Sequence, residues 1–259
     1  MFLSLVSGSC GDSTLISDGR TTLLADCGLS CKKLEQAMET AGVKPESLNG
    51  ILITHEHSDH VKGVGVVSRK YNLPVYATLG THANMNLSGV DERNIKYISP
   101  DVDFEIGTIG VRPFSIPHDA ADPIGFYFFF GEKKLSLATD IGKMNDYIFD
   151  CLKNSMAVIL ESNHDTQMLR TGRYPAVLKK RILSDFGHLS NDDAAKTVCE
   201  LIKNGTKYVM LGHLSNENNT PTKAYTKTAE DIEKMGAVIG KDVALSVAAR
   251  FEVSCFKCI

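Results

Sequence analysis

The segment Thr54-His55-Glu56-His57-Ser58-Asp59-His60 carries the strongest chemical signal in the chain. Three of the eight histidines fall in its last six residues, directly after a short apolar run, so a solvated loop with chance histidines is a weak explanation. In extended backbone His55 and His57 point to the same side, and both imidazoles can reach one metal ion. Asp59 and His60 follow as the chain turns into a helix and can reach a second ion. Imidazole and carboxylate ligands suit Zn²⁺, Mn²⁺ or Fe²⁺.

The elements that must position these ligands alternate between β-like and helical patterns. This mixture predicts layered α/β packing in one domain over residues 1–259, with helices covering sheets and no repeat or linker. Strands are predicted at residues 2–6, 14–17, 21–25, 51–54, 109–116, 125–130, 134–138, 157–160, 207–211, 243–247 and 251–255, and helices at residues 30–41, 59–71, 191–203 and 222–235.

Composition excludes several classes of protein. The hydrophobic fraction of 43% and the charged fraction of 23% are ordinary for a globular chain. A net charge of −3 disfavours a wide electrostatic footprint on nucleic acid, although a local basic patch stays possible. No apolar run approaches bilayer-spanning length, so no membrane association is expected. The seven irregularly spaced cysteines indicate a reducing compartment, and we expect a cytoplasmic protein. The terminal Cys255-Phe256-Lys257-Cys258 is interpreted as a strand with buried thiols.

The segment 54–60 resembles the T-H-x-H-x-D-H motif of the metallo-β-lactamase superfamily. The resemblance implies a four-layer αββα sandwich with two divalent metal ions bound at the ends of strands. It implies that Asp26 supports the ligands, that His118 completes the first metal site, that Asp140 bridges both ions, and that His213 binds the second. Because His57 stands where the oxygen-reducing di-iron branch has glutamate, a hydrolytic metal pair is favoured over a redox pair.

Two Gly-His-Leu-Ser sequences, at residues 187–190 and 212–215, are similar to those of tRNA 3′-processing nucleases in the same superfamily. The resemblance implies that His188 is a general acid oriented by Glu161, and that His213 is a metal ligand. Judged by itself, His188 could equally be a surface histidine at the start of a helix.

Nearly the full length of the chain looks like the YycJ/WalJ branch of the superfamily, on the segments 7–13, 161–165 and 212–219. Members of that branch are regarded as DNA-directed nucleases with single-strand exonuclease activity. The resemblance therefore implies a two-metal phosphodiesterase acting on single-stranded DNA. Cys10 and Asp12 depart from the serine and asparagine expected there, in a loop that can lie near substrate.

Basic residues between His164 and His188 support a nucleic-acid substrate, because an arginine fork suits phosphate. The alternative for Lys179-Lys180-Arg181 is a solvated helix face. The predicted substrate contacts are His164, Arg173, Ser190 and Ser215. His82 has no motif around it and is expected to be structural.

The hypothesis for the reaction is a hydroxide shared by two metal ions that attacks phosphorus, with Asp59 as both ligand and aligning group and His188 as proton donor. Two alternatives stay open. One is a hydrolase on the same fold for a small phosphodiester, a thioester or a lactam. The other is a regulatory relative that keeps the fold without turnover, which the intact ligand set disfavours. Oligomeric state is not predicted.

Overall fold

The computed structural model describes residues 1–256, and these residues form two compact units. Unit 1 comprises Met1–Ser115, Ala120–Phe130 and the described residues from Ala249 onward. Unit 2 comprises Ile116–Asp119 and Gly131–Ala248. Each unit has its own strands and helices, and each holds part of the predicted site. The single domain over residues 1–259 stays a prediction.

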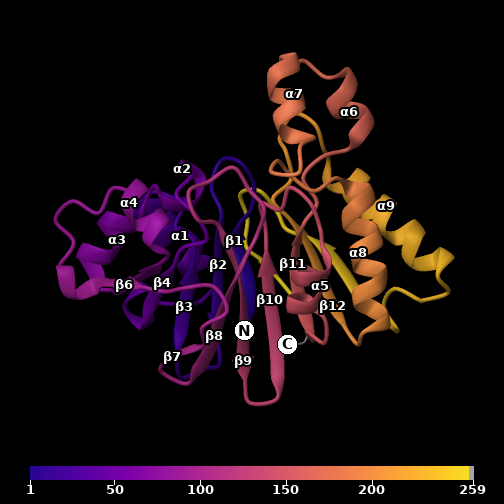
Figure 1. Ribbon diagram of the computed structural model, residues 1–259. Coiled ribbons are helices and arrows are strands. Elements are labelled where there is room, and N and C mark those ends of the chain that lie inside the picture. The colour runs from indigo at the N-terminus through magenta and orange to yellow at the C-terminus, as the bar shows by residue number, and fades with distance from the viewer. Residues whose placement is uncertain (257–259) are drawn as a thin grey trace. The chain divides into compact units, whose positions relative to one another are not determined.

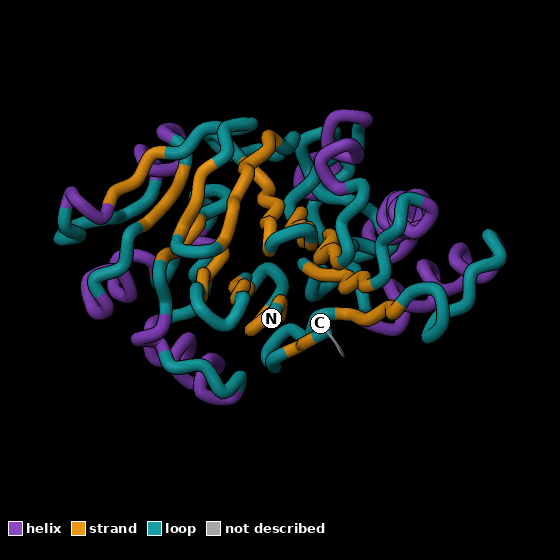
Figure 2. Tube along the Cα trace, turned by 90° about the horizontal axis from the view of Figure 1, so that it is seen from below, coloured by secondary structure: helices purple, strands orange, loops and turns teal. Residues whose placement is uncertain are grey.

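Unit 1 is built on a mixed sheet with the order β14-β1-β2-β3-β4-β5-β6. The pairs β1–β2 and β2–β3 are antiparallel, whereas β3, β4, β5 and β6 are parallel. Since β14 pairs with β1, the two ends of the described chain lie together (Figure 2). The strands of this sheet are β1 (Phe2–Val6), β2 (Ser13–Ser17), β3 (Thr22–Ala25), β4 (Gly50–Leu52), β5 (Val75–Ala77), β6 (Ile95–Tyr97) and β14 (Ser254–Cys255).

The helices of unit 1 bury aliphatic side chains against this sheet. Leu34 and Met38 of α1 and Val64 and Val67 of α3 lie in one apolar cluster with strand residues such as Ile51. These helix positions are three or four residues apart, as one buried helix face requires. The helices are α1 (Cys31–Thr40), α2 (Ser58–Val61), α3 (Val64–Tyr71), α4 (Leu79–Asn84) and the short 3₁₀ turns Pro45–Ser47 and Glu92–Asn94. An antiparallel meander follows, of β7 (Phe104–Ile106), β8 (Ile109–Ser115) and β9 (Ile124–Phe130).

Unit 2 contains four parallel strands in the order β13-β12-β11-β10. All five residues of β11 are buried, as expected for a strand inside a parallel sheet. Figure 1 shows α8 and α9 side by side along these strands, with α6 and α7 projecting from the same unit. The elements are β10 (Lys133–Ala138), α5 (Asp146–Leu152), β11 (Ala157–Glu161), α6 (Thr166–Thr171), α7 (Ala176–Ile182), α8 (Asn191–Lys203), β12 (Tyr208–Gly212), α9 (Pro221–Lys234) and β13 (Ala244–Val247).

Two predicted elements differ from the structure. The helix expected over residues 59–71 is interrupted at Gly63, whose N–H donates to the Cys27 carbonyl at 2.8 Å. A Cβ atom at Gly63 would lie 2.1 Å from the Leu29 carbonyl oxygen, so the close backbone approach needs glycine. The strand expected over residues 251–255 is limited to β14, because Phe251 is 74% exposed and pairs with no strand. The four short helices α4 to α7 were not predicted.

The prediction of buried thiols covers Cys255 and Cys258. Of these two residues, Cys258 lies outside the described part of the chain. Cys255 is exposed, which contradicts the expected burial of that thiol. Within residues 1–256, none of the helices combines the length and the apolar character that crossing a bilayer requires.

Candidate metal centre and active site

Asp26 organises the histidine motif of unit 1. It follows β3, and its carboxylate accepts hydrogen bonds from the Thr54 N–H at 2.9 Å and the Thr54 hydroxyl at 2.8 Å. The same carboxylate lies 2.8 Å from Nδ1 of His60, and the Thr54 hydroxyl lies 3.0 Å from Nδ1 of His55. A histidine held through Nδ1 by an oxygen presents Nε2 as the ligand atom, which is how metal-binding histidines are usually oriented.

The motif side chains converge within unit 1. The ring centroid of His55 lies 4.6 Å from that of His57 and 4.1 Å from that of His60. Nε2 of His60 lies 3.9 Å from a carboxylate oxygen of Asp59. His55 and His60 are buried, whereas Asp59 keeps about a fifth of its side chain exposed. The donor set is therefore three imidazoles and a carboxylate on one short segment, a combination that suits a borderline divalent ion.

Glu161 organises the candidate ligands of unit 2. It is the last residue of β11 and is fully buried. One oxygen lies 2.8 Å from Nδ1 of His188 and 2.9 Å from Nδ1 of His213. The other accepts the backbone N–H groups of Ile141 at 2.8 Å and Leu189 at 3.0 Å. Burial alone would raise the pKa of Glu161, but the two imidazoles and these hydrogen bonds hold it below its ordinary value.

Asp140 and His118 complete the group in unit 2. One carboxylate oxygen of Asp140 lies 3.3 Å from Nδ1 of His213, 3.6 Å from Nδ1 of His188 and 3.7 Å from Nε2 of His118. Nδ1 of His118 lies 3.0 Å from the Gly187 carbonyl oxygen, which again orients Nε2 as a ligand. Burial lowers the pKa of His118, so its neutral, metal-binding form is favoured at neutral pH.

The residues present fit a metal ion. Ligand atoms of Asp140, Glu161, His188 and His213 all lie within 4.8 Å of one another. Glu161 is already saturated by four donors, so Asp140 is the carboxylate of this group that is suited to an ion. The donors are hard or borderline, which matches the Zn²⁺, Mn²⁺ or Fe²⁺ expected from the sequence.

Three of these residues adopt left-handed backbone where a strand ends. Asp26 follows β3 with a φ of 59°, Asp140 follows β10 with a φ of 59°, and His213 follows β12 with a φ of 53°. Non-glycine residues rarely adopt this conformation, and it accumulates at functional sites. It turns the chain sharply, so that each side chain stands at the carboxyl end of its strand.

The predicted substrate contacts are placed as follows. His164 is buried, and its backbone bridges to Ser190. The Ser190 hydroxyl caps α8, because it accepts the Asp193 N–H at 3.1 Å. The Ser215 hydroxyl accepts the Asn218 N–H at 3.2 Å. Arg173 is exposed between α6 and α7. Both serines therefore support local backbone, whereas Arg173 faces solvent.

Sequence reasoning missed several supporting groups. It assigned Glu161 to His188 alone, although the same carboxylate also holds His213. It gave no role to Thr54 or to the Gly187 carbonyl. For Thr54 the available signal was its place as the first residue of the family motif. His82 behaves as expected for a structural residue, since it is buried with Nε2 3.0 Å from the Lys96 carbonyl oxygen.

A model of the beta-lactamase superfamily domain matches residues 21–213. The chain belongs to the metallo-β-lactamase superfamily. Within it, this chain is 41% identical to the exodeoxyribonuclease YycJ of Bacillus anthracis over 242 residues, which cover 93% of this chain and 92% of that protein. It is 38% identical to the exodeoxyribonuclease WalJ of Streptococcus pneumoniae, with 92% and 90% covered.

Among solved structures, the metallo-β-lactamase fold protein YhfI of Bacillus subtilis matches with a TM-score of 0.71 at 14% identity, covering 97% of both chains. The metallo-β-lactamase fold predicted from the sequence is thus confirmed, as is membership of the YycJ/WalJ-like branch. This member of the metallo-β-lactamase superfamily is a metal-dependent hydrolase.

Proposed function

We propose that the chain is a two-metal exonuclease that hydrolyses phosphodiester bonds of single-stranded DNA. The YycJ and WalJ relatives are exodeoxyribonucleases, which supports a DNA substrate, and the similarity extends over more than nine-tenths of this chain. The observation that carries the proposal is the pairing of Nδ1 of His188 with Glu161 at 2.8 Å. An imidazole held in this way by a buried carboxylate is equipped to deliver a proton from Nε2 to a leaving oxygen.

Seven side chains are proposed as ligands of two divalent ions. When bound, such a pair lowers the pKa of water to about 7 and neutralises charge on the phosphate. His57 precedes α2 and Asp59 lies in its first turn, and the Asp26–Thr54 pair holds the imidazoles of His55 and His60. The proposed ligands are His55, His57, Asp59, His60, His118, Asp140 and His213.

The exposures of His188 and Glu161 favour their division of roles. The His188 side chain is 17% exposed, whereas Glu161 is 0% exposed. His188 can therefore contact a substrate, whereas Glu161, which orients it, is shielded from solvent. Asp59, which is also partly exposed, is proposed to align the attacking water as well as to bind metal.

Substrate contact is proposed for the region between His164 and Ser215. Arg173 and the exposed Lys180 carry charge suited to phosphate, whereas Arg181 forms an ion pair with Asp119. His164 is proposed to contact the substrate or to support groups that contact it. The hydroxyls of Ser190 and Ser215 are proposed to contribute by holding the backbone of the substrate-binding region in place. A local basic region of this kind is compatible with a chain whose net charge is −3.

A cytoplasmic location is part of the proposal. The six described cysteines, including the buried Cys27 and the exposed Cys10, form no disulfide among residues 1–256. Free thiols of both kinds are typical of a reducing compartment.

The test is digestion of a 5′-phosphorylated, end-labelled single-stranded DNA by protein reconstituted with Mn²⁺. We expect a ladder of short products, and no products from Asp140→Ala. Asp150→Ala is the matched control, because Asp150 is an exposed aspartate of α5 in the same unit. Metal-loaded protein that leaves the DNA intact but cleaves a small phosphodiester or a thioester would contradict the nuclease assignment and support the alternative hydrolase.

A further inference from the structure

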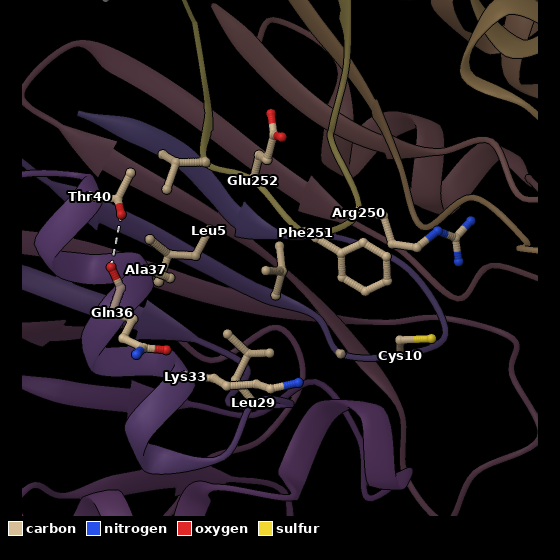
Figure 3. Close-up of a pocket in the computed structure, with 13 residues that line it drawn as sticks. Leu5, Cys10, Leu29, Lys33, Gln36, Ala37, Thr40, Arg250, Phe251 and Glu252 are labelled. Carbon is tan, nitrogen blue, oxygen red and sulfur yellow. Dashed lines mark hydrogen bonds between the residues drawn. The ribbon is translucent and has the colours of Figure 1, made fainter.

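A cavity of about 610 Å³ opens in unit 1 (Figure 3). It is lined by the loop after β1, by one face of α1 and by residues 250–253. Its inner wall is aliphatic, with Leu5, Leu29 and Val253. The volume falls within the range of about 300–1,000 Å³ that is usual for ligand sites. None of the proposed metal ligands lines this cavity.

The rim of the cavity combines an aromatic ring with an exposed lysine. Phe251 is 74% exposed, an unusual exposure for so large an apolar side chain. Lys33 of α1 is exposed, whereas Arg250 is half-buried and one of its guanidinium nitrogens is fully buried. Glu252 also lines the cavity, but Figure 3 shows its carboxylate directed away from the Phe251 ring. The rim therefore presents a stacking surface together with positive charge.

The cavity is separated from the histidine motif by single residues. Gly11 and Leu29 line it, and their neighbours Asp12 and Gly28 contact the motif backbone. The Asp12 N–H donates to the Asp59 carbonyl at 2.7 Å. A Cβ atom at Gly28 would lie 1.6 Å from that same carbonyl oxygen, so the two backbones touch. The cavity and the histidine motif are thus neighbours within unit 1.

We infer that this cavity is a subsite for single-stranded nucleic acid, in which a base stacks on Phe251 while Lys33 contacts an adjoining phosphate. The inference rests on the proposed function and assigns to it a second substrate-binding region. An exposed ring beside cations is how single strands are bound without sequence readout. An acidic peptide would use the lysine but would gain little from the ring, so the ring decides between the two.

The first experiment measures binding of a phosphorothioate-linked thymidine oligonucleotide of about 12 nucleotides, within the ~4–16 that a compact single-strand site covers. Fluorescence anisotropy compares the metal-loaded wild type with Phe251→Ala and Phe251→Trp. Removing one base-stacking ring should weaken binding by about 5- to 150-fold. Phe251→Trp should bind as the wild type does. Thermal unfolding of each variant checks that the exposed substitution leaves the fold intact.

The second measurement compares Lys33→Gln with Lys32→Gln. Both lysines are exposed on the first turn of α1, but only Lys33 lines the cavity. Lys33→Gln should reduce the slope of log affinity against log salt by about 0.7, the value for one phosphate contact on a single strand. Lys32→Gln should leave both affinity and slope unchanged. Equal effects of the two substitutions would overturn the assignment, because charge anywhere on α1 would then suffice.

A third measurement uses two exposed thiols of unit 1, of which Cys10 lines the cavity and Cys255 does not. The oligonucleotide should slow alkylation of Cys10 and leave that of Cys255 unchanged. If wild-type protein neither binds nor cleaves DNA, the proposed function fails. If it does both while Phe251→Ala binds equally well, the subsite alone fails. Protection of Cys10 by polyglutamate and not by DNA would likewise overturn the subsite and identify an acidic peptide as the occupant.

Discussion

The two units supply their proposed metal ligands in different ways. Unit 1 presents four of them on one segment, residues 55–60, around the start of α2. Unit 2 collects its group from positions far apart in the chain, with His118, Asp140 and His213 near three different strands. A contiguous segment needs only local turn geometry to converge, whereas scattered residues need the whole sheet. Damage to the fold should therefore disperse the ligands of unit 2 before those of unit 1.

Each unit also buries one carboxylate that orients imidazoles, but the two carboxylates differ in the number of groups that each one holds. Asp26 lies against one imidazole, that of His60, and reaches His55 through Thr54. Glu161 holds both His188 and His213 directly, and two backbone N–H groups as well. A single change at Glu161 should thus disturb both the proposed acid and a proposed ligand, whereas a change at Asp26 should disturb ligands alone.

Glu161→Gln should have the largest effect. The amide can accept on one side only, so either the imidazoles or the N–H groups of Ile141 and Leu189 lose their partner. We expect turnover to fall at least as far as in His188→Ala, metal affinity to fall about 10- to 100-fold, and the free energy of unfolding to fall by about 3–5 kcal/mol. Metal titration, DNA digestion and urea unfolding measure the three. A variant that keeps its metal affinity would show that His213 does not depend on Glu161.

His188→Ala should be the next largest, with turnover about 10²–10⁴-fold lower and metal content unchanged, because a positioned acid is lost. Single-turnover cleavage of labelled DNA and metal analysis are the measurements. A substrate whose leaving group needs no proton, such as a p-nitrophenyl phosphodiester, should be hydrolysed nearly as fast by the variant as by the wild type. Loss of metal from the variant would instead make His188 a ligand.

Asp26→Asn should weaken metal binding about 10- to 100-fold, since the carboxylate that orients His60 becomes a neutral amide. At saturating metal the turnover should recover, because His188 and Glu161 are unaffected. Metal titration followed by cleavage assays at excess Mn²⁺ tests this. A turnover that stays low with metal fully bound would show that Asp26 contributes beyond ligand orientation.

The smallest effect concerns one buried histidine in each unit. Burial lowers the pKa of His164 to about 4, against the opposing charges of Glu161, Asp193 and Asp165. The unfolded chain therefore binds a proton that the folded chain does not bind between about pH 6.5 and 4. Stability should fall by about 2–3 kcal/mol as the pH falls through this window.

His164→Gln should remove that part of the pH dependence, as measured by urea unfolding of metal-loaded wild type and variant at several pH values. Protonation of the metal ligands affects both proteins and cancels in the difference. His82→Gln in unit 1 should give a smaller change of the same sign, since a hydrogen bond to the Lys96 carbonyl favours protonated His82 and opposes the effect of burial. Equal pH profiles of wild type and His164→Gln would contradict the prediction.

The success of prediction from the sequence also differs between the contiguous segment of unit 1 and the scattered residues of unit 2. The motif at residues 55–60 was recognisable because its chemistry is local, and long periodic elements such as α8 were predicted to the residue. His118, Asp140 and His213 came only from the family resemblance, because nothing local marks them. The double role of Glu161 and the cavity under Phe251 depend on tertiary contacts. The short helices α6 and α7 carry no clear periodic signal in six or seven residues.

The left-handed residues that end β3, β10 and β12 have a consequence for the stability of the fold. Backbone of this kind costs about 1–3 kcal/mol at a non-glycine residue, and glycine removes the penalty. Replacement of Asp26, Asp140 or His213 by glycine would relieve this strain, but it would also take a buried side chain away from its partners. Those partners are Thr54 and His60 for Asp26, His213 for Asp140, and Glu161 for His213. The strain at the three strand ends is thus offset by contacts of the same side chains, and the net effect of glycine on stability should be smaller than either contribution.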